Sequence, residues 1–177
     1  QATDDIRDNM LYFLENHDEH RIASEPFAGN AKKGIPGLIV SVLLQQNPFM
    51  LYAGQEFGER GMDEEGFSGR DGRTTIFDYW TVSTINRGYF NRRNMKKDEK
   101  ELEKVYSTIL NIACKEKAVS NGATYDLMYA NPELNRKVYA FLRKQNKELL
   151  IVAANFSDEA VECSVNIPQH AFDFLSI

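Results

Sequence analysis

Residues 11–20 read LYFLENHDEH, and this stretch decides the fold class that the sequence predicts. The apolar run from Leu11 to Leu14, together with Met10, is typical of a short buried strand over residues 10–14. It gives way to Asn16, His17 and Asp18, whose side chains can hydrogen-bond a polyhydroxylated substrate. Strands of an α/β barrel present active-site groups in this way, with polar residues at the carboxyl end. The stretch therefore predicts a barrel strand that leads into a candidate substrate site.

A second strand of the same kind follows after one helix. Pro36 suits the first turn of a helix that continues over residues 37–46, and Pro48 ends it. Residues 49–53, FMLYA, then form another apolar run before Gly54. Because both strands are apolar throughout, the order strand, helix, strand predicts a parallel βαβ unit.

Beyond this unit the sequence predicts a long loop and one more helix. The loop covers about residues 57–97, and a loop of this length is usually functional or carries small elements of its own. Asp98 with Glu101 forms a capping-box pattern at the start of the helix. The apolar stripe of this helix consists of Leu102, Val105, Tyr106, Ile109, Leu110 and Ala113.

The pattern of predicted elements changes near residue 119 from alternating strands and helices to consecutive strands, and we predict a domain boundary there. Residues 138–142, 149–155 and 160–167 are predicted to be strands. Apolar residues alternate at period two in the last of them, so only one of its faces is expected to be buried. Short links between consecutive strands predict an antiparallel meander, which differs from the first part of the chain.

Composition narrows the possible partners. A net charge of −5 argues against nonspecific binding of nucleic acid, which requires a basic surface. The longest apolar stretch, residues 35–44, is too short to cross a membrane, which takes ~20 residues. Cys114 and Cys163 form neither a disulfide framework nor a zinc site, and they leave the cellular compartment open.

The tripeptide Asn16-His17-Asp18, followed by Arg21 and Ile22, closely resembles the end of the seventh barrel strand in the α-amylase family of glycoside hydrolases. His20 departs from the proline that is often found there. The resemblance continues along the chain in the family's order. Residues 47–58 resemble the eighth strand and its turn, the helix from residue 98 resembles the closing helix, and residues 136–143 with 150–157 resemble the start of the C-terminal β-sandwich.

The resemblance implies an α/β fold followed by an all-β fold. Residues 1–118 would form the last two strand–helix units of a (β/α)8 TIM barrel, and residues 119–177 an antiparallel β-sandwich domain that is partial. A complete barrel takes ~250 residues, so the N-terminal portion of the barrel is expected in the same protein before Gln1.

The resemblance also implies roles for individual residues in the cleavage of starch-type α-glucans, either oligosaccharide or polysaccharide, with retention of configuration. Asp18 corresponds to the carboxylate that stabilises the transition state, and His17, Asn16 and Arg21 correspond to substrate-binding residues. Gln55 and Glu56 are expected to order loops rather than to touch sugar.

The nucleophile and the general acid/base of such an enzyme lie on its fourth and fifth strands, which would precede Gln1. We therefore expect the chain alone to be inactive, and we interpret Asp4, Asp5 and Asp8 as surface charge. No cofactor is evident. Many relatives bind calcium, but no ligand set is visible in this sequence.

Simpler interpretations of the same residues remain open. Asn16 and Asp18 are also typical of a turn in which both make local backbone bonds. Phe77, Tyr79 and Trp80 are equally compatible with stacking on glucosyl rings and with packing under the loop.

Other binding motifs fit less well. His17 and His20 lack the spacing of a zinc-protease pattern, and residues 68–73 lack the end of a phosphate loop and are interpreted as a tight turn. The basic residues of the long loop are interpreted as a solvated face rather than a nucleic-acid site; they are Arg87, Arg92, Arg93, Lys96 and Lys97.

Two functions outside catalysis also stay open. The chain could be a non-catalytic glucan-binding protein, or a module that assembles with a partner through exposed strand edges.

Overall fold

The computed structural model describes residues 5–6, 9–63, 69–77 and 81–177. The chain divides into two compact units, each built from segments that are separated in sequence. Unit 1 comprises Gln1–Met10, Ile39–Asn47 and Ile109–Ile177, and unit 2 comprises Leu11–Leu38 and Pro48–Thr108. This division does not follow a single cut in the chain, and the boundary near residue 119 stays a prediction.

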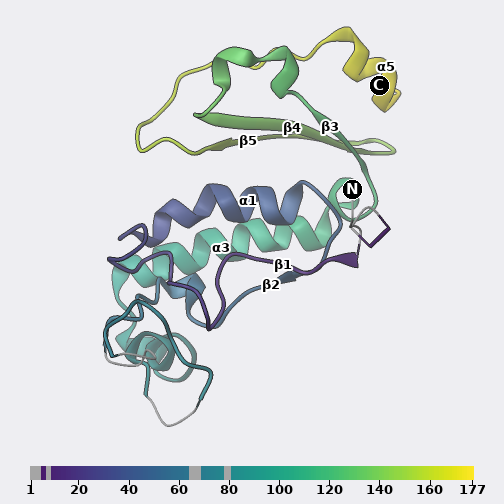
Figure 1. Cartoon of the computed structure of the whole chain (residues 1–177). Coiled ribbons are helices and arrows are strands. Elements are labelled where there is room, and N and C mark those ends of the chain that lie inside the picture. Colours follow the sequence, from purple (N-terminus) through teal and green to yellow (C-terminus); the bar gives the residue numbers. More distant parts are fainter. Residues whose placement is uncertain (1–4, 7–8, 64–68, 78–80) are drawn as a thin grey trace. The chain divides into compact units, whose positions relative to one another are not determined.

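Unit 2 contains the predicted parallel strand pair, but the prediction that the first strand is buried is wrong, because Leu11 and Phe13 are 51% and 45% exposed. β1 (Tyr12–Phe13) pairs in parallel with β2 (Phe49–Met50), as Figure 1 shows. The backbone N–H of Tyr12 donates to the carbonyl of Pro48 at 2.9 Å. Both strands are shorter than the predicted apolar runs because only two residue pairs face each other in the ladder. Between the strands, α1 (Ile35–Leu43) has Pro36 in its first turn, as expected.

Short helices occupy the described parts of the loops, which confirms that the long loop carries elements of its own. They are η2 (Ala31–Gly34), η3 (Gln55–Phe57), α2 (Ser83–Ile85), the π-helix η4 (Asn86–Phe90) and η5 (Arg92–Asn94). α3 (Lys97–Lys115) then turns Leu102, Tyr106 and Ile109 into the interior, as the predicted stripe requires. No helix in the described part of the chain is long and apolar enough to cross a membrane.

The start of α3 differs from the predicted capping box. The carboxylate that returns to the backbone is Glu99, whose Oε2 accepts from the N–H of Lys96 at 2.8 Å. Its Oε1 accepts from Nη2 of Arg87 at 2.6 Å. Burial raises the pKa of the Glu99 carboxyl, but the hydrogen bonds from Arg87 and Lys96 outweigh burial and lower this pKa overall.

Unit 1 contains a three-stranded antiparallel sheet in the order β3-β4-β5. The strands are β3 (Ala123–Asp126), β4 (Val138–Gln145) and β5 (Glu148–Asn155), and the helices near them are α4 (Lys117–Ser120), η6 (Met128–Ala130), η7 (Pro132–Leu134) and α5 (Gln169–Leu175). The core on one face of the sheet consists of Tyr125, Leu127, Leu134, Val138, Ala140, Leu142, Ala171 and Leu175. The predicted meander is thus confirmed for β4 and β5, whereas β3 and α5 were not predicted.

The strand predicted at residues 160–167 is wrong. The backbone N–H of Asn166 donates to Oδ1 of Asn131 at 2.6 Å, and the carbonyl of Asn166 accepts from Nδ2 of Asn131 at 2.9 Å. The side chain of Asn131 therefore takes the place that a neighbouring strand would have. The period-two pattern still has a packing role, because Val161, Val165 and Ile167 lie against the core.

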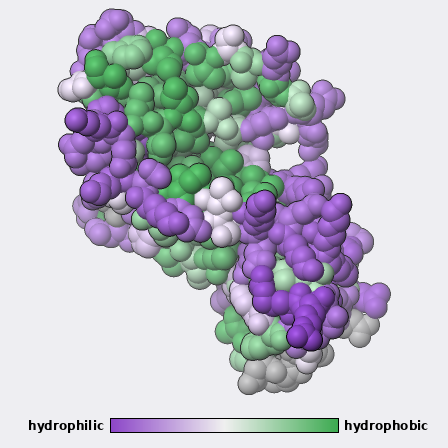
Figure 2. Space-filling view, turned by 180° about the vertical axis from the view of Figure 1, so that it is seen from behind, coloured by the Kyte–Doolittle hydropathy of each residue, from purple (hydrophilic) through white to green (hydrophobic). Residues whose placement is uncertain are grey.

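One face of the sheet is only partly covered. Ile151 on β5 lies opposite the buried Leu142, so both side chains point to the face that carries the core. Ile151 is nevertheless 58% exposed, and Leu149 on the same strand is 38% exposed. Figure 2 shows hydrophobic residues gathered at the upper part of the view, where Figure 1 places the sheet.

A buried arginine organises the other face of the sheet. Arg143 on β4 is 1% exposed and has no carboxylate partner among the described residues. Its Nη1 donates to the carbonyl of Leu44 at 2.8 Å, and its Nε donates to the carbonyl of Ala118 at 2.9 Å. It also donates to the carbonyl of Val119 and to Oγ1 of Thr124. The guanidinium thus caps the ends of α1 and α4.

Arg143→Lys is expected to lower the free energy of unfolding by about 2–4 kcal/mol, because an ammonium group cannot satisfy the same set of buried oxygens. Urea unfolding followed by circular dichroism measures the change. Arg136→Lys, at an exposed position before β4, is the control and is expected to change stability by less than about 0.5 kcal/mol. Equal effects of the two substitutions would contradict the structural role of Arg143.

Glu99→Gln is expected to cost about 1–3 kcal/mol of stability near pH 7. Because the folded pKa of Glu99 lies below the ordinary value of 4.5, the ionised carboxylate stabilises the folded chain above that value. The stabilisation is lost as the pH falls through the lower folded pKa, so variant and parent should converge in acid. Glu103→Gln breaks the more exposed pair with Arg92 and should cost only about 0–1 kcal/mol.

Candidate functional site

The candidate site is the turn that follows β1. Oδ1 of Asn16 accepts from the backbone N–H groups of Asp18 and Glu19, both at 2.9 Å. The local turn role that the sequence left open is therefore present for Asn16. Nε2 of His17 lies 3.4 Å from Oδ1 of Asp18, and these side chains are 41% and 69% exposed. The turn presents His17 and Asp18 to solvent, where a ligand can reach them.

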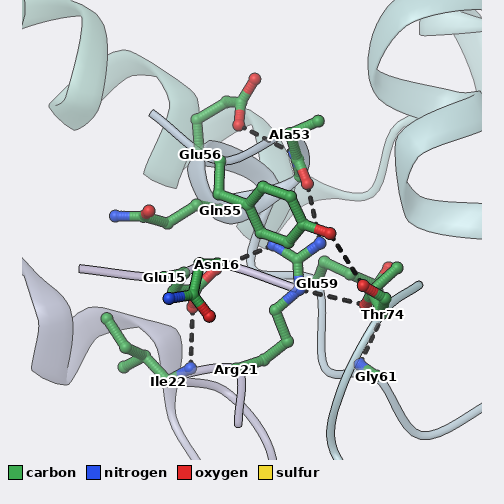
Figure 3. A network of polar contacts seen from close by, with 12 residues as sticks. Glu15, Asn16, Arg21, Ile22, Ala53, Gln55, Glu56, Glu59, Gly61 and Thr74 are labelled. Atoms are coloured by element: carbon green, nitrogen blue, oxygen red, sulfur yellow. Dashed lines mark hydrogen bonds and ion pairs between the residues drawn. The ribbon is translucent and has the colours of Figure 1, made fainter. Parts of the chain in front are cut away.

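A buried ion pair lies beneath this turn, as Figure 3 shows. Nη1 of Arg21 donates to Oε2 of Glu15 at 2.8 Å, and the two side chains are 0% and 2% exposed. The other oxygen of Glu15 accepts from the backbone N–H of Ile22 at 2.7 Å. Glu15 thus connects the two ends of the turn. Burial raises the pKa of the Glu15 carboxyl, although the neighbouring Arg21 opposes that shift.

Arg21 also ties the turn to other segments of unit 2. Its Nη2 donates to the carbonyl of Ala53 beyond β2 at 2.9 Å, and its Nε donates to Oγ1 of Thr74 at 3.0 Å. The guanidinium carbon lies 4.2 Å from the ring centroid of Tyr52, a cation–π geometry. The hydroxyl of Tyr52 in turn donates to the carbonyl of Thr74 at 2.7 Å.

The segment around Gly72 completes this network. The N–H of Arg21 donates to the carbonyl of Gly72 at 2.7 Å, and the N–H of Gly72 donates to the carbonyl of Gly61 at 2.9 Å. Gly72 has a φ of +82°, and a Cβ at this position would lie 2.9 Å from Cβ of Ser24, so glycine is required. Oδ1 of Asp71 accepts from the N–H of Arg73 at 3.0 Å, which is consistent with the tight turn predicted for residues 68–73; Ser68 lies outside the described residues.

Gln55 and Glu56 make the loop-ordering contacts that were expected of them. Nε2 of Gln55 donates to the hydroxyl of Tyr106 at 3.1 Å. The carboxylate of Glu56 accepts from the N–H of Gly54 at 3.1 Å and from the hydroxyl of Tyr89. Both side chains are buried, so they stabilise the chain after β2 from within.

The sequence singled out Asn16, His17, Asp18 and Arg21, and the structure separates them into two groups. His17 and Asp18 are accessible, whereas the guanidinium of Arg21 is enclosed. Sequence reasoning missed Glu15, Tyr52 and Thr74, which hold Arg21. A signal existed only for Glu15, because it is a charged residue directly after an apolar strand.

The structure describes only some of the remaining residues that the sequence suggested for ligand binding. Phe77 is 54% exposed, while Tyr79 and Trp80 lie outside the described residues. Arg87 and Arg92 of the basic loop pair with Glu99 and Glu103, which neutralises much of its charge. Within the described ranges, no group of three or more His, Cys, Asp or Glu side chains is arranged to hold a metal ion.

Comparison with known protein families finds a similarity in the C-terminal part of the chain. Residues 130–175 match the family described as Maltogenic Amylase, C-terminal domain. No curated protein sequence matches the chain.

Solved structures provide further matches. AmyP in complex with maltose has a TM-score of 0.53 at 20% identity, over 80% of this chain and 29% of that one. Trehalose-6-phosphate hydrolase of Bacillus licheniformis has a TM-score of 0.54 at 19% identity, over 82% and 34%. An isomaltulose synthase mutant of Erwinia rhapontici in complex with D-glucose has a TM-score of 0.54 at 22% identity, over 84% and 34%. At these identities the likeness concerns the fold.

The chain therefore shares a fold with structures of amylase-type glycoside hydrolases, and its residues 130–175 resemble the C-terminal domain of maltogenic amylases. The chain spans about a third of the length of the structures that it matches.

Glu15→Gln is expected to lower the free energy of unfolding by about 3–5 kcal/mol, because it leaves the charge of Arg21 buried without a counter-ion. Glu25→Gln is the matched control. It breaks an Arg60–Glu25 pair with the same separation, 2.8 Å, but with side chains 54% and 70% exposed, so about 0–1 kcal/mol is expected.

Urea unfolding of both variants checks this expectation. A double variant, Glu15→Gln with Arg21→Gln, removes both charges and should recover part of the loss. Equal destabilisation by Glu15→Gln and Glu25→Gln would show that burial does not make the inner pair important.

Proposed function

We propose that the chain is part of a retaining glycoside hydrolase that acts on α-glucosidic bonds of starch-type glucans. The observation that carries the proposal is the turn after β1, in which His17 and Asp18 are exposed above a buried ion pair. Structures that share the fold include AmyP in complexes with maltose and with maltotriose, which supports an α-glucan as the ligand class.

In this proposal β1, α1, β2 and α3 are the last two strand–helix units of a (β/α)8 barrel. The parallel pairing of β1 and β2, with α1 between them in the chain, supports this assignment. β3, β4 and β5 would be the start of a β-sandwich. The exposure of Leu149 and Ile151 on the core face of the sheet supports it, since a second sheet would cover them.

Asp18 is proposed to stabilise the transition state. Hydrogen bonds from sugar hydroxyls to its carboxylate would strengthen as the ring flattens toward an oxocarbenium ion, and such bonds lower the barrier rather than only hold substrate. His17 would donate to the same sugar, and Asn16 would fix the turn. Because Arg21 is enclosed, we assign it to positioning the turn through Glu15 and not to direct contact with sugar.

The two bond-breaking carboxylates are proposed to lie outside these 177 residues. The chain alone should therefore bind maltooligosaccharides weakly, in the millimolar range, and should not hydrolyse them.

Asp18→Ala is expected to weaken maltotriose binding by the chain about tenfold or more, because a charged acceptor of sugar hydroxyls is lost. Titration of the ¹⁵N-labelled chain with maltotriose, followed by chemical shifts of the turn, measures the affinity. Glu19→Gln alters another exposed carboxylate next to Asp18 and should leave the affinity within about twofold.

Other outcomes point elsewhere. Turnover of maltotriose by the pure chain would overturn the assignment of the bond-breaking groups. Unchanged binding by Asp18→Ala would remove Asp18 from the site. The absence of any sugar binding, together with stable self-association, would favour a partner-assembly module.

A further inference from the structure

Unit 1 contains a groove that the proposed catalytic chemistry does not use. The groove has a volume of about 490 Å³ and lies where η6, η7 and the beginning of β4 meet the chain that leaves β5. The residues that decide its character are Tyr129, Tyr139 and Phe156, which are aromatic, and Asn135, Arg136 and Lys137, which are polar.

The groove presents aromatic rings to solvent. Tyr129 is 64% exposed and Phe156 is 52% exposed. A bound ligand could therefore cover a large apolar area of each ring. Tyr139 lies between them in the chain and is half-buried. Exposed rings gathered in a concave site, with a few polar groups beside them, are typical of a ligand pocket.

Neighbouring groups hold the rings of Tyr129 and Tyr139, and the backbone of Phe156, in place before any ligand binds. Tyr129 packs edge-on against Tyr125 with ring centroids 6.1 Å apart, and their hydroxyls are hydrogen-bonded. The hydroxyl of Tyr139 donates to Oδ2 of Asp126 at 3.2 Å. The N–H of Phe156 donates to the carbonyl of Lys137 at 2.6 Å. A preorganised surface loses little entropy when it binds.

Polar donors complete the groove. Asn135, Arg136 and Lys137 are exposed, and their side chains make no hydrogen bond or ion pair with the residues that the structure describes. Arg136 also has a φ of +67°, a conformation that is costly for a residue with a Cβ. Backbone strain of this kind is often retained where a side chain has a functional position.

The combination of aromatic rings and hydrogen-bond donors fits a sugar. Aromatic faces carry negative electrostatic potential and suit the C–H faces of a pyranose ring, whereas amide, guanidinium and ammonium groups donate to its hydroxyls. The carboxylate of Asp126 accepts from the Tyr139 hydroxyl and so orients that hydroxyl beside the groove.

We propose that this groove is a second α-glucan-binding site, separate from the turn that carries Asp18. The ligand class rests on the proposed function of the chain. A site of this kind would hold a polymeric substrate through contacts that take no part in bond cleavage.

Titration of the ¹⁵N-labelled full chain with maltoheptaose tests the proposal. Chemical shifts of residues 127–139 and 155–156 should change in the millimolar range, independently of those in residues 15–22. Tyr129→Ala and Phe156→Ala should each weaken binding at the groove about five- to tenfold, because each removes a stacking face. Both should leave binding at the turn unchanged.

Phe27→Ala is the matched control, because Phe27 is a 65% exposed aromatic residue of unit 2 outside the groove. It should leave the groove affinity unchanged. Shifts confined to the turn would overturn the second site and leave the proposed function standing. Shifts confined to the groove would support the second site and count against the role of Asp18. Loss of affinity with Phe27→Ala equal to that with Tyr129→Ala would also overturn it.

Discussion

The buried guanidinium of Arg21 is the interaction on which the candidate site depends. A cation removed from water must be compensated on all sides, and here Glu15, the carbonyl of Ala53 and the hydroxyl of Thr74 share that task. These partners come from the end of β1, the end of β2 and the loop near Gly72. Any conformation that separates them leaves a charge buried alone, so one side chain fixes the relation of three segments. The geometry of the turn is thus a consequence of charge burial and not of local propensity alone.

Unit 1 also contains a buried arginine, whose charge is compensated by a different kind of partner. Arg143 is as deeply buried as Arg21, but its partners are carbonyls at the ends of α1 and α4 instead of a carboxylate. Carbonyls at a helix C-terminus carry partial negative charge and lack donors within the helix, so they suit a cation. Burial lowers the pKa of Arg143, yet a guanidinium keeps its proton in either setting. Arginine can therefore join elements in both units, because its fork of donors reaches several acceptors at once.

Local pattern predicted what depends on local pattern. The parallel pair, α1, α3 and the β4–β5 hairpin all follow from apolar periodicity and turn residues in their own segments. The strand expected at residues 160–167 failed because Asn131, far away in sequence, occupies the backbone groups of Asn166. The polar composition of β3 concealed a strand that only pairing with β4 reveals. The partners of Arg21 were out of reach for the same reason, since Thr74 is separated from it by 53 positions.

In the candidate site, the residues exposed to a ligand differ from the buried residues that hold the turn in place. This difference explains which part of the site a sequence motif can reveal. Asp18 must remain exposed to meet a ligand, but an exposed carboxylate in a turn has little to fix it. Rigidity is supplied instead by residues that no ligand can reach, Glu15 and Arg21 below the turn. Tyr129 stands in the same relation to the more buried Tyr125. A motif names the exposed group, because its chemistry is distinctive. The buried support is ordinary in composition, so only its three-dimensional contacts identify it as part of the site.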